Sequence, residues 1–216
     1  MSKTDTLTAL SDLVDAVQAR PQQAGRARRL VALAGAPGSG KSTLASRLTE
    51  ALCAAGTQAA VVPMDGFHLD NRLLAERDLL PRKGAPETFD QRGFARLVAA
   101  LASDRDVIYP IFDRSLDLAI AGAGAVDGAC EVAVLEGNYL LFDSDGWRDL
   151  APMWDLSVRV DVPRSVLRQR LVERWHIHGL APAEAEARAD GNDMVNADRI
   201  LAAALPAQIT WKGQTE

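Results

Sequence analysis

The sequence predicts an α/β fold in which a mainly parallel sheet lies between two layers of helices. Apolar runs at residues 30–34, 59–62, 132–135 and 156–162, the first three uninterrupted by polar residues, suit buried strands, and each stops within two residues of a glycine or proline. Segments with the helical spacing of apolar residues alternate with these runs. A glycine-rich turn joins the first run to the first such segment. We therefore expect a three-layer α/β/α sandwich formed by residues 1–216 as a single domain.

The composition is that of a soluble globular protein, with 48% hydrophobic and 25% charged residues. A formal net charge of −5 gives no electrostatic attraction to nucleic acid or to an anionic membrane. No stretch approaches the roughly 18 apolar residues that a spanning helix needs, so we expect no membrane insertion and a cytoplasmic location. Cys53 and Cys130 lack metal-ligand spacing and are expected to be buried free thiols. The sequence leaves a homodimer open.

The remaining elements are predicted with different clarity. Residues 1–25 are expected to hold an amphipathic helix, with a stripe from Leu10 to Val17, and a linker. Residues 71–90 are expected to be mostly loop, with one or two helical turns, because prolines and a glycine interrupt them. A helix follows around residues 94–101, with Thr88 or Asp90 as its cap. Short strands are expected at 107–109 and 209–211, whereas the Ala- and Gly-rich segment 116–128 is left unassigned.

The glycine-rich turn matches the pattern Gly-x4-Gly-Lys-Ser, with Gly35, Gly40, Lys41 and Ser42 at the fixed positions. Glycines let successive backbone N–H groups turn toward phosphate oxygens, and the following helix N-terminus adds partial positive charge. Lys41 is predicted to reach the β- and γ-phosphates of ATP, and the Ser42 hydroxyl to bind Mg²⁺. The alternative is a tight turn with an exposed lysine. The complete predicted loop comprises Gly35, Ala36, Pro37, Gly38, Ser39, Gly40, Lys41, Ser42 and Thr43.

Two carboxylates directly follow predicted strands, Asp65 after the second apolar run and Glu136 after the third. Ligands of open α/β sheets bind beyond the carboxyl ends of the strands. A carboxylate there can hold Mg²⁺ or accept a proton from a substrate hydroxyl. The alternative for Asp65 is a local turn with Gly66, and Gly137 is expected to mark a sharp bend after Glu136.

Basic residues supply a further signal near residues 164–195. Arg170 and Arg174 lie four apart on one predicted helix face, close to Arg168, and glycines bracket the stretch that follows. Phosphoryl transfer needs cations over the transferring group, so this segment is a candidate lid, with an ordinary solvated helix as the alternative. His68 is predicted either to bind substrate or to satisfy a loop carbonyl.

Three segments resemble the phosphoribulokinase/uridine kinase family of P-loop kinases: residues 65–68 (Asp-Gly-Phe-His), 82–90 (Arg-Lys-Gly-Ala-Pro-Glu-Thr-Phe-Asp) and 135–141 (Leu-Glu-Gly-Asn-Tyr-Leu-Leu). Within the family the chain is most similar to small bacterial fructose transport system kinases and more distantly to pantothenate kinases. The resemblance implies that Asp65 is the catalytic base and that Glu136 lies near Mg²⁺ and substrate. It also implies lid arginines, acceptor-site residues and a segment near the nucleotide base: Arg170, Arg174, Arg82, Lys83, Tyr109, Asp113, Arg114, Asn192, Asp193 and Asn196.

The resemblance implies an ATP- and Mg²⁺-dependent kinase acting on a hydroxyl of a small molecule. The predicted lid lacks the Arg-Gly pair usual in uridine kinases, and His68 stands where they commonly have an aromatic residue. The chain is also shorter than a pantothenate kinase. These departures favour a fructose-like sugar, with uridine, another nucleoside or pantothenate as alternatives. A GTPase is disfavoured because the sequence has no Asn-Lys-x-Asp stretch. A catalytically idle, ATP-binding regulator of a transport system remains a further alternative.

Overall fold

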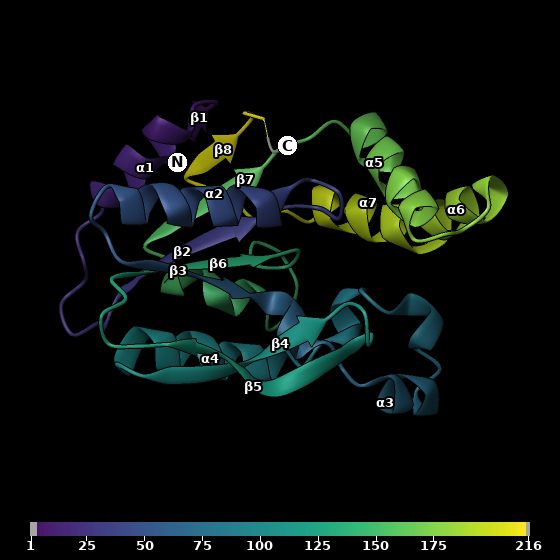
Figure 1. The fold of residues 1–216 in the computed structure, drawn as a ribbon, viewed down its shortest axis with the longest axis horizontal. Coiled ribbons are helices and arrows are strands. Elements are labelled where there is room, and N and C mark those ends of the chain that lie inside the picture. Colours follow the sequence, from purple (N-terminus) through teal and green to yellow (C-terminus); the bar gives the residue numbers. More distant parts are fainter. Residues whose placement is uncertain (1–3, 215–216) are drawn as a thin grey trace.

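A computed structural model describes residues 4–214 and contains a six-stranded sheet, all of whose neighbouring strands run parallel. The strand order is β1-β8-β7-β2-β6-β3, as Figure 1 shows. The strands are β1 (Asp5–Leu7), β2 (Arg29–Ala34), β3 (Ala59–Pro63), β6 (Val132–Gly137), β7 (Leu156–Val160) and β8 (Ile209–Trp211). The four longer apolar runs are confirmed as strands. β1 was not predicted, because three residues give too short a pattern.

Helices cover both faces of the sheet, which confirms the three-layer architecture (Figure 1). Helices α1 (Leu10–Gln18) and α2 (Lys41–Ala54) lie on one face and α4 (Gln91–Ser103) on the other. The side chains of β2 alternate between the two cores: Val31 packs with α1 and α2, whereas Leu30 packs with α4. Asp90 caps α4 by accepting a hydrogen bond from the Gly93 amide at 2.8 Å.

A separate antiparallel hairpin lies on the same face as α4 and consists of β4 (Val107–Asp113) and β5 (Leu118–Val126). The predicted strand at 107–109 therefore extends to Asp113, and the unassigned segment 116–128 contains its partner. Most of β5 is exposed and built from alanine and glycine, so no alternation of apolar and polar residues marked it. Gly124 is required because a Cβ there would lie 2.3 Å from the Tyr109 ring.

Residues 71–90, which were expected to be mostly loop, contain more helix than predicted, in three short elements that another short turn precedes. The preceding turn is η1 (Met64–Phe67), and the three elements are α3 (Asn71–Glu76), η2 (Leu80–Arg82) and η3 (Pro86–Thr88). Another short turn, η4 (Arg148–Met153), precedes β7.

The helices after β7 lie at the end of the sheet to which its strands point (Figure 1). They are α5 (Arg164–Ile177), α6 (Pro182–Arg188), the π-helical turn η5 (Ala189–Asp193) and α7 (Met194–Ala202). This group covers the segment expected to act as a lid. Across residues 4–214, no helix combines the length and the apolar character that crossing a membrane requires.

Candidate functional site

The glycine-rich turn connects β2 to α2 and forms one wall of the site. Gly38 and Gly40 have φ angles of 78° and 80°, a left-handed conformation that favours glycine. Gly40 is also the N-cap of α2, so the amino end of a 14-residue helix opens at the loop. A Cβ on Gly35 would lie 2.5 Å from the Ser39 hydroxyl, which is buried inside the turn. This geometry is a cradle for phosphate.

Helix α5 packs directly on this turn. A Cβ on Gly38 would lie 3.2 Å from Cγ of Leu171 and 3.3 Å from the Leu167 carbonyl oxygen. Arg170 Nη1 donates to the Gly38 carbonyl oxygen at 3.4 Å. The candidate lid therefore touches the turn through backbone and apolar contacts as well as through an arginine.

Two neighbouring strands bring Asp65 and Glu136 to the same edge of the sheet. Pro63 on β3 is in register with Glu136 on β6, so Asp65 follows just beyond its partner strand's end. Gly137 lies against Met64, since a Cβ there would be 2.6 Å from the Met64 Cβ. β6 continues to Gly137, so the expected bend comes just after this glycine, at Asn138 and Tyr139, and close packing against Met64 is a further reason for the glycine.

Glu136 is only 5% exposed and lies beneath the turn. Its side chain is hydrogen-bonded to Ser42. Burial raises the pKa of the Glu136 carboxyl, and the Lys41 ammonium opposes that shift. The Oε2 oxygen of Glu136 is buried and has no hydrogen-bond partner in the structure. A buried carboxylate oxygen without a donor is costly, so this atom fits a site for a cation.

The residues present fit Mg²⁺. Ser42 and Glu136 supply two oxygen-bearing side chains beside the phosphate cradle. Within the described part of the chain, no group of three His, Cys, Asp or Glu residues could hold a metal by itself. Mg²⁺ commonly takes one or two protein ligands together with phosphate oxygens and water, which is the type of site that these two residues would complete.

Asp65 faces the cleft and pairs with an arginine from the hairpin. Arg114 Nη2 lies 3.1 Å from Asp65 Oδ2, and the two side chains are 65% and 23% exposed. The Asp65 carboxylate therefore does not form a local turn with Gly66. Gly66 is required because a Cβ would fall 2.0 Å from the Pro110 carbonyl oxygen of β4. Residues next to Asp65 thus fix the hairpin against the end of β3.

His68 lies between two aromatic rings, with ring centroids 4.0 Å from Phe89 and 4.7 Å from Phe112. Its Nδ1 is 2.7 Å from the Asp65 carbonyl oxygen, which can only accept, so Nδ1 carries the hydrogen. Burial lowers the pKa of the His68 imidazole, and the negative charge of Asp65 opposes that shift. A neutral ring with Nδ1 protonated leaves Nε2 as a hydrogen-bond acceptor. His68 satisfies a loop carbonyl and also lines the cleft.

Lys83 connects the loop at residues 80–84 to the turn of the hairpin. Its Nζ lies 2.7 Å from Asn71 Oδ1 and 2.9 Å from Asp117 Oδ1. It also stands 5.0 Å from the centroid of the Phe112 ring. Only 11% of the Lys83 side chain is exposed, so this ammonium is held in place by two elements at once.

These residues line one cleft of about 880 Å³. We call residues 37–43 its loop side. Its hairpin side consists of Asp65, His68, Leu80, Lys83, Gly84, Phe112, Arg114 and Asp117. Predicted residues that line the cleft are Pro37, Gly38, Gly40, Lys41, Ser42, Thr43, Asp65, His68, Lys83, Arg114, Arg174, Asp193 and Asn196. Phe112, Asp117, Trp175 and Arg188 line it as well and were not predicted.

Several predicted acceptor-site residues lie outside the cleft. Tyr109 is buried, and its hydroxyl donates to the Val61 carbonyl oxygen at 3.2 Å. Asp113 accepts hydrogen bonds from Ser115 in its own turn. The side chain of Arg82 is directed to Asn196, 3.3 Å from its Oδ1. Arg82 and Asp113 are each next in sequence to a residue that lines the cleft, and the Tyr109 side chain lies on another face of its strand. The sequence alone did not separate these three residues from the residues that line the cleft.

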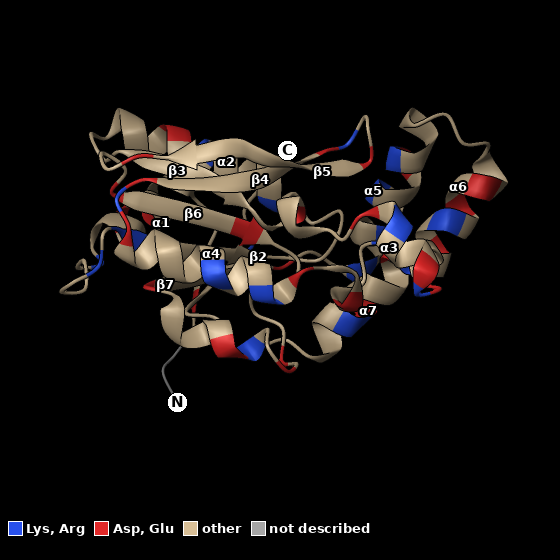
Figure 2. Ribbon diagram, turned by 90° about the horizontal axis from the view of Figure 1, so that it is seen from below, with Lys and Arg blue, Asp and Glu red and all other residues tan. Residues whose placement is uncertain are grey.

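Basic and acidic residues gather on the helices after β7, while β4 and β5 carry few (Figure 2). Arg164 and Arg168 form bidentate pairs with Asp198 and Asp190. These two arginines do not line the cleft. Arg174 does line it, and its Nη2 lies 3.1 Å from Asp193 Oδ2. On the predicted arginine helix, Arg164 and Arg168 thus form structural ion pairs, whereas Arg174 lies at the cleft.

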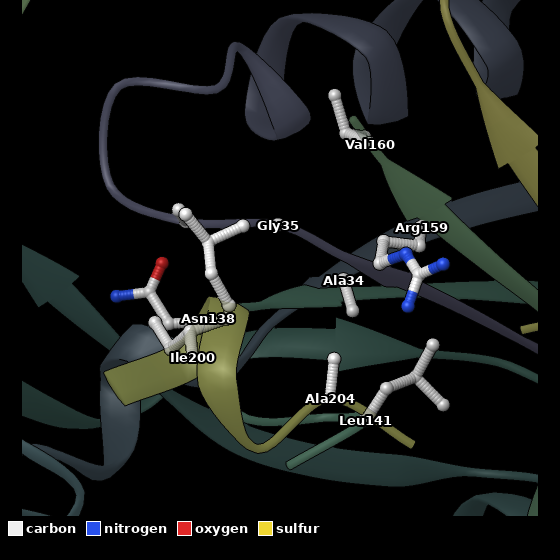
Figure 3. Close-up of a pocket in the computed structure, with 10 residues that line it drawn as sticks. Ala34, Gly35, Asn138, Leu141, Arg159, Val160, Ile200 and Ala204 are labelled. Atoms are coloured by element: carbon white, nitrogen blue, oxygen red, sulfur yellow. The ribbon is translucent and has the colours of Figure 1, made fainter. Parts of the chain in front are cut away.

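A smaller pocket lies beside the first residues of the glycine-rich turn (Figure 3). Gly35, Asn138, Arg159 and Ile200 contribute to its wall. Its volume of about 20 Å³ corresponds to the space of a single water molecule. The larger cleft is therefore the candidate site.

Comparison with known proteins agrees with this geometry. A family model described as "Methylmalonyl Co-A mutase-associated GTPase MeaB" matches residues 7–68, a segment that contains the phosphate cradle. The chain is 36% identical over 179 residues to a "Putative uridine kinase" of Schizosaccharomyces pombe, with 78% of this chain and 76% of that protein covered. It is 32% identical to a "Pantothenate kinase" of Mycolicibacterium vanbaalenii, covering 74% of this chain and 51% of that one.

Among solved structures, the chain is similar to a "putative fructose transport system kinase" from Silicibacter sp. TM1040. The two share 59% identity and a TM-score of 0.92, over 95% of this chain and all of the other. The similarity in sequence and in structure between the two proteins thus extends over nearly their whole length.

Proposed function

Because the chain belongs to the phosphoribulokinase/uridine kinase family of P-loop kinases, we propose that it transfers the γ-phosphoryl group of ATP to a hydroxyl of a fructose-like sugar. Its membership makes it an ATP-dependent phosphotransferase. The observation that carries the assignment of residues is that Lys41 and Asp65 line the same cleft and both lie near the Glu136 carboxylate. Such an arrangement can hold the donor and the acceptor together in line.

In the proposed reaction, the Asp65 carboxylate takes the proton of the acceptor hydroxyl. The hydroxyl oxygen forms a bond to the γ-phosphorus as the bond to the β,γ-bridging oxygen breaks, which leaves ADP. Lys41 and the backbone N–H groups of the turn bind the phosphates. When bound, Mg²⁺ would neutralise phosphate charge, and Ser42 and Glu136 would hold it.

In this proposal residues 164–195 act as a lid. Arg174 approaches the transferring group from the cleft wall, and Arg170 supports the turn through the Gly38 carbonyl. Excluding water would favour transfer to the acceptor over hydrolysis.

The hairpin side of the cleft supports a polyhydroxyl acceptor. Phe112 contributes to the wall, Arg114 offers donors, and Asp65, Asp117 and His68 Nε2 offer acceptors, while Lys83 holds Asp117 in place. Alternating donors and acceptors around an aromatic wall suit a sugar. The name of the Silicibacter protein, at 59% identity, supports the same class. The names of the two curated relatives support uridine and pantothenate as alternatives.

The test is a coupled ADP-release screen over sugars, nucleosides and pantothenate, with fructose first. We expect turnover with fructose or a related ketose that exceeds ATP hydrolysis without acceptor. Turnover with uridine or pantothenate alone would replace the sugar assignment. Binding of ATP in isothermal titration, without turnover over the whole panel, would instead favour an idle regulator.

A further inference from the structure

Two consecutive residues of the π-helical turn η5 make contacts in different directions. Asp193 Oδ2 accepts from Arg174 Nη2 at 3.1 Å and from Trp175 Nε1 at 2.6 Å. Asn192 Nδ2 donates to the Lys83 carbonyl oxygen at 2.8 Å. Asn192 and Asp193 are 3% and 9% exposed. One short turn therefore contacts both the lid arginine and the loop on the hairpin side.

The contact at Lys83 continues to the hairpin. The Lys83 ammonium pairs with Asp117, and Nζ also donates to the Asp117 carbonyl oxygen at 2.7 Å. Asp117 belongs to the same turn as Arg114, which reaches Asp65. Polar contacts and chain neighbours thus link Arg174, through η5 and Lys83, to the hairpin turn that carries Arg114, the residue that pairs with the proposed base.

The side chains of η5 that make these contacts lie in the protein interior rather than on its surface. Asn196, 1% exposed, donates to Asn192 Oδ1 at 3.4 Å and accepts from Arg82. Tyr139 fixes the same loop by donating to the Gly84 carbonyl oxygen at 2.6 Å. Buried amides with satisfied partners specify one arrangement, because leaving them unpaired is costly. π-helical turns often occur at functional positions. Asn192 and Asn196 contact the loop at residues 82–84, and Asn196 also lines the cleft.

We infer that Asn192 is a positioning residue that couples nucleotide binding at the loop side to the order of the hairpin side. Nucleotide phosphates engage Arg174, whose partner Asp193 is the next residue in the chain after Asn192. Restricting the position of Asp193 also restricts its neighbour Asn192. Through the contacts described above, it then restricts Lys83 and Asp117. Coupling of this type is reciprocal, so the acceptor would also strengthen nucleotide binding.

Hydrogen exchange with a non-hydrolysable ATP analogue and Mg²⁺ tests this inference without an acceptor, so its outcome is independent of the sugar assignment. In the parent protein we expect the analogue to slow amide exchange at residues 82–85 and 113–119 about fivefold or more. In Asn192→Ala that slowing should be lost at both segments, while slowing at residues 37–43 remains. Asp198→Asn is the matched control, because it breaks an α5–α7 ion pair that does not reach the cleft.

A second variant keeps the inference open to refutation if Asn192→Ala does not fold. Asp117→Ala removes the ion pair with Lys83 and the hydrogen bond from Asn71 Nδ2, at a residue whose side chain is 58% exposed, and leaves the bond from Lys83 Nζ to the main-chain oxygen of residue 117. It should reduce the slowing at 113–119 and keep it at 82–85. Equal slowing of all segments in the parent and either variant would overturn the coupling.

Discussion

The two sides of the cleft are built in opposite ways. The loop side comes from one continuous segment, residues 37–43, and its shape depends on left-handed glycines and a helix N-terminus. The hairpin side is assembled from separate segments whose side chains hold one another, as the contacts of Lys83 show. Backbone geometry can bind the phosphates common to all nucleotides, whereas side chains can be exchanged to select an acceptor. In the proposed reaction, main-chain geometry therefore determines which donor binds, and side chains determine which acceptor binds.

The largest expected effect comes from Asp65→Asn, which should separate the two sides. Removing the proposed base should lower kcat by about 10³-fold, within the range for general base catalysis. Affinity for the ATP analogue should change little, because the loop side is untouched. Steady-state ADP release and isothermal titration measure the two quantities.

Asp113→Asn is the matched control for this change, since Asp113 lies in the same region but bonds to its own turn. It should retain nearly parental turnover. If Asp65→Asn turned over its acceptor at the parental rate, Asp65 would not be the base.

The next effect concerns the attachment of the hairpin. A Cβ at Gly66 would meet the Pro110 carbonyl oxygen at 2.0 Å, so Gly66→Ala must push β4 away from the end of β3. We expect a loss of about 3 kcal/mol of unfolding free energy and a Tm lower by roughly 10 °C. Turnover should fall while analogue binding survives.

Calorimetry gives the Tm, and Gly191→Ala is the control, because no atom lies within 4 Å of the added Cβ. An unchanged Tm in Gly66→Ala would show that the hairpin does not depend on this contact. Loss of nucleotide binding in the folded variant would instead show that the two sides are not separable.

The same contrast explains what could be predicted from the sequence. The phosphate cradle follows from local spacing, Asp65 comes two residues after the end of β3, and Glu136 is near the end of β6. Parallel strands then bring both acids to one edge without further information. Residue order along the chain is sufficient for these features.

The hairpin side needed information that a single segment does not contain. Phe112 and Asp117 reach the cleft only because β4 pairs with an Ala- and Gly-rich strand whose sequence has no strand pattern. Trp175 lies in the cleft wall, where its ring is held by Arg174 and Arg188, whose guanidinium carbons lie 5.3 and 5.0 Å from the ring centroid. Arg188 belongs to another helix, α6. Such contacts depend on tertiary packing, which spacing along the chain does not determine.

The smallest effect is a pH dependence confined to the hairpin side. Burial holds the pKa of folded His68 below 6.5, its value in the unfolded chain, so the unfolded protein takes up the proton first as pH falls. The stability that depends on neutral His68 is therefore complete above about pH 6.5 and is lost as the pH falls through the lower folded pKa. Relative to His68→Gln, the parent protein should lose unfolding free energy between about pH 7.5 and about pH 5.

Urea denaturation at both pH values measures this difference, and His178→Gln is the control because His178 is exposed. An equal loss of unfolding free energy in the parent and in His68→Gln would show that His68 is protonated equally readily in the folded and the unfolded protein. The ring would then not be the neutral acceptor that the sugar assignment requires of Nε2. If the difference appears, Nε2 is free of a proton at neutral pH, and the hairpin side presents an acceptor to a substrate hydroxyl beside Asp65.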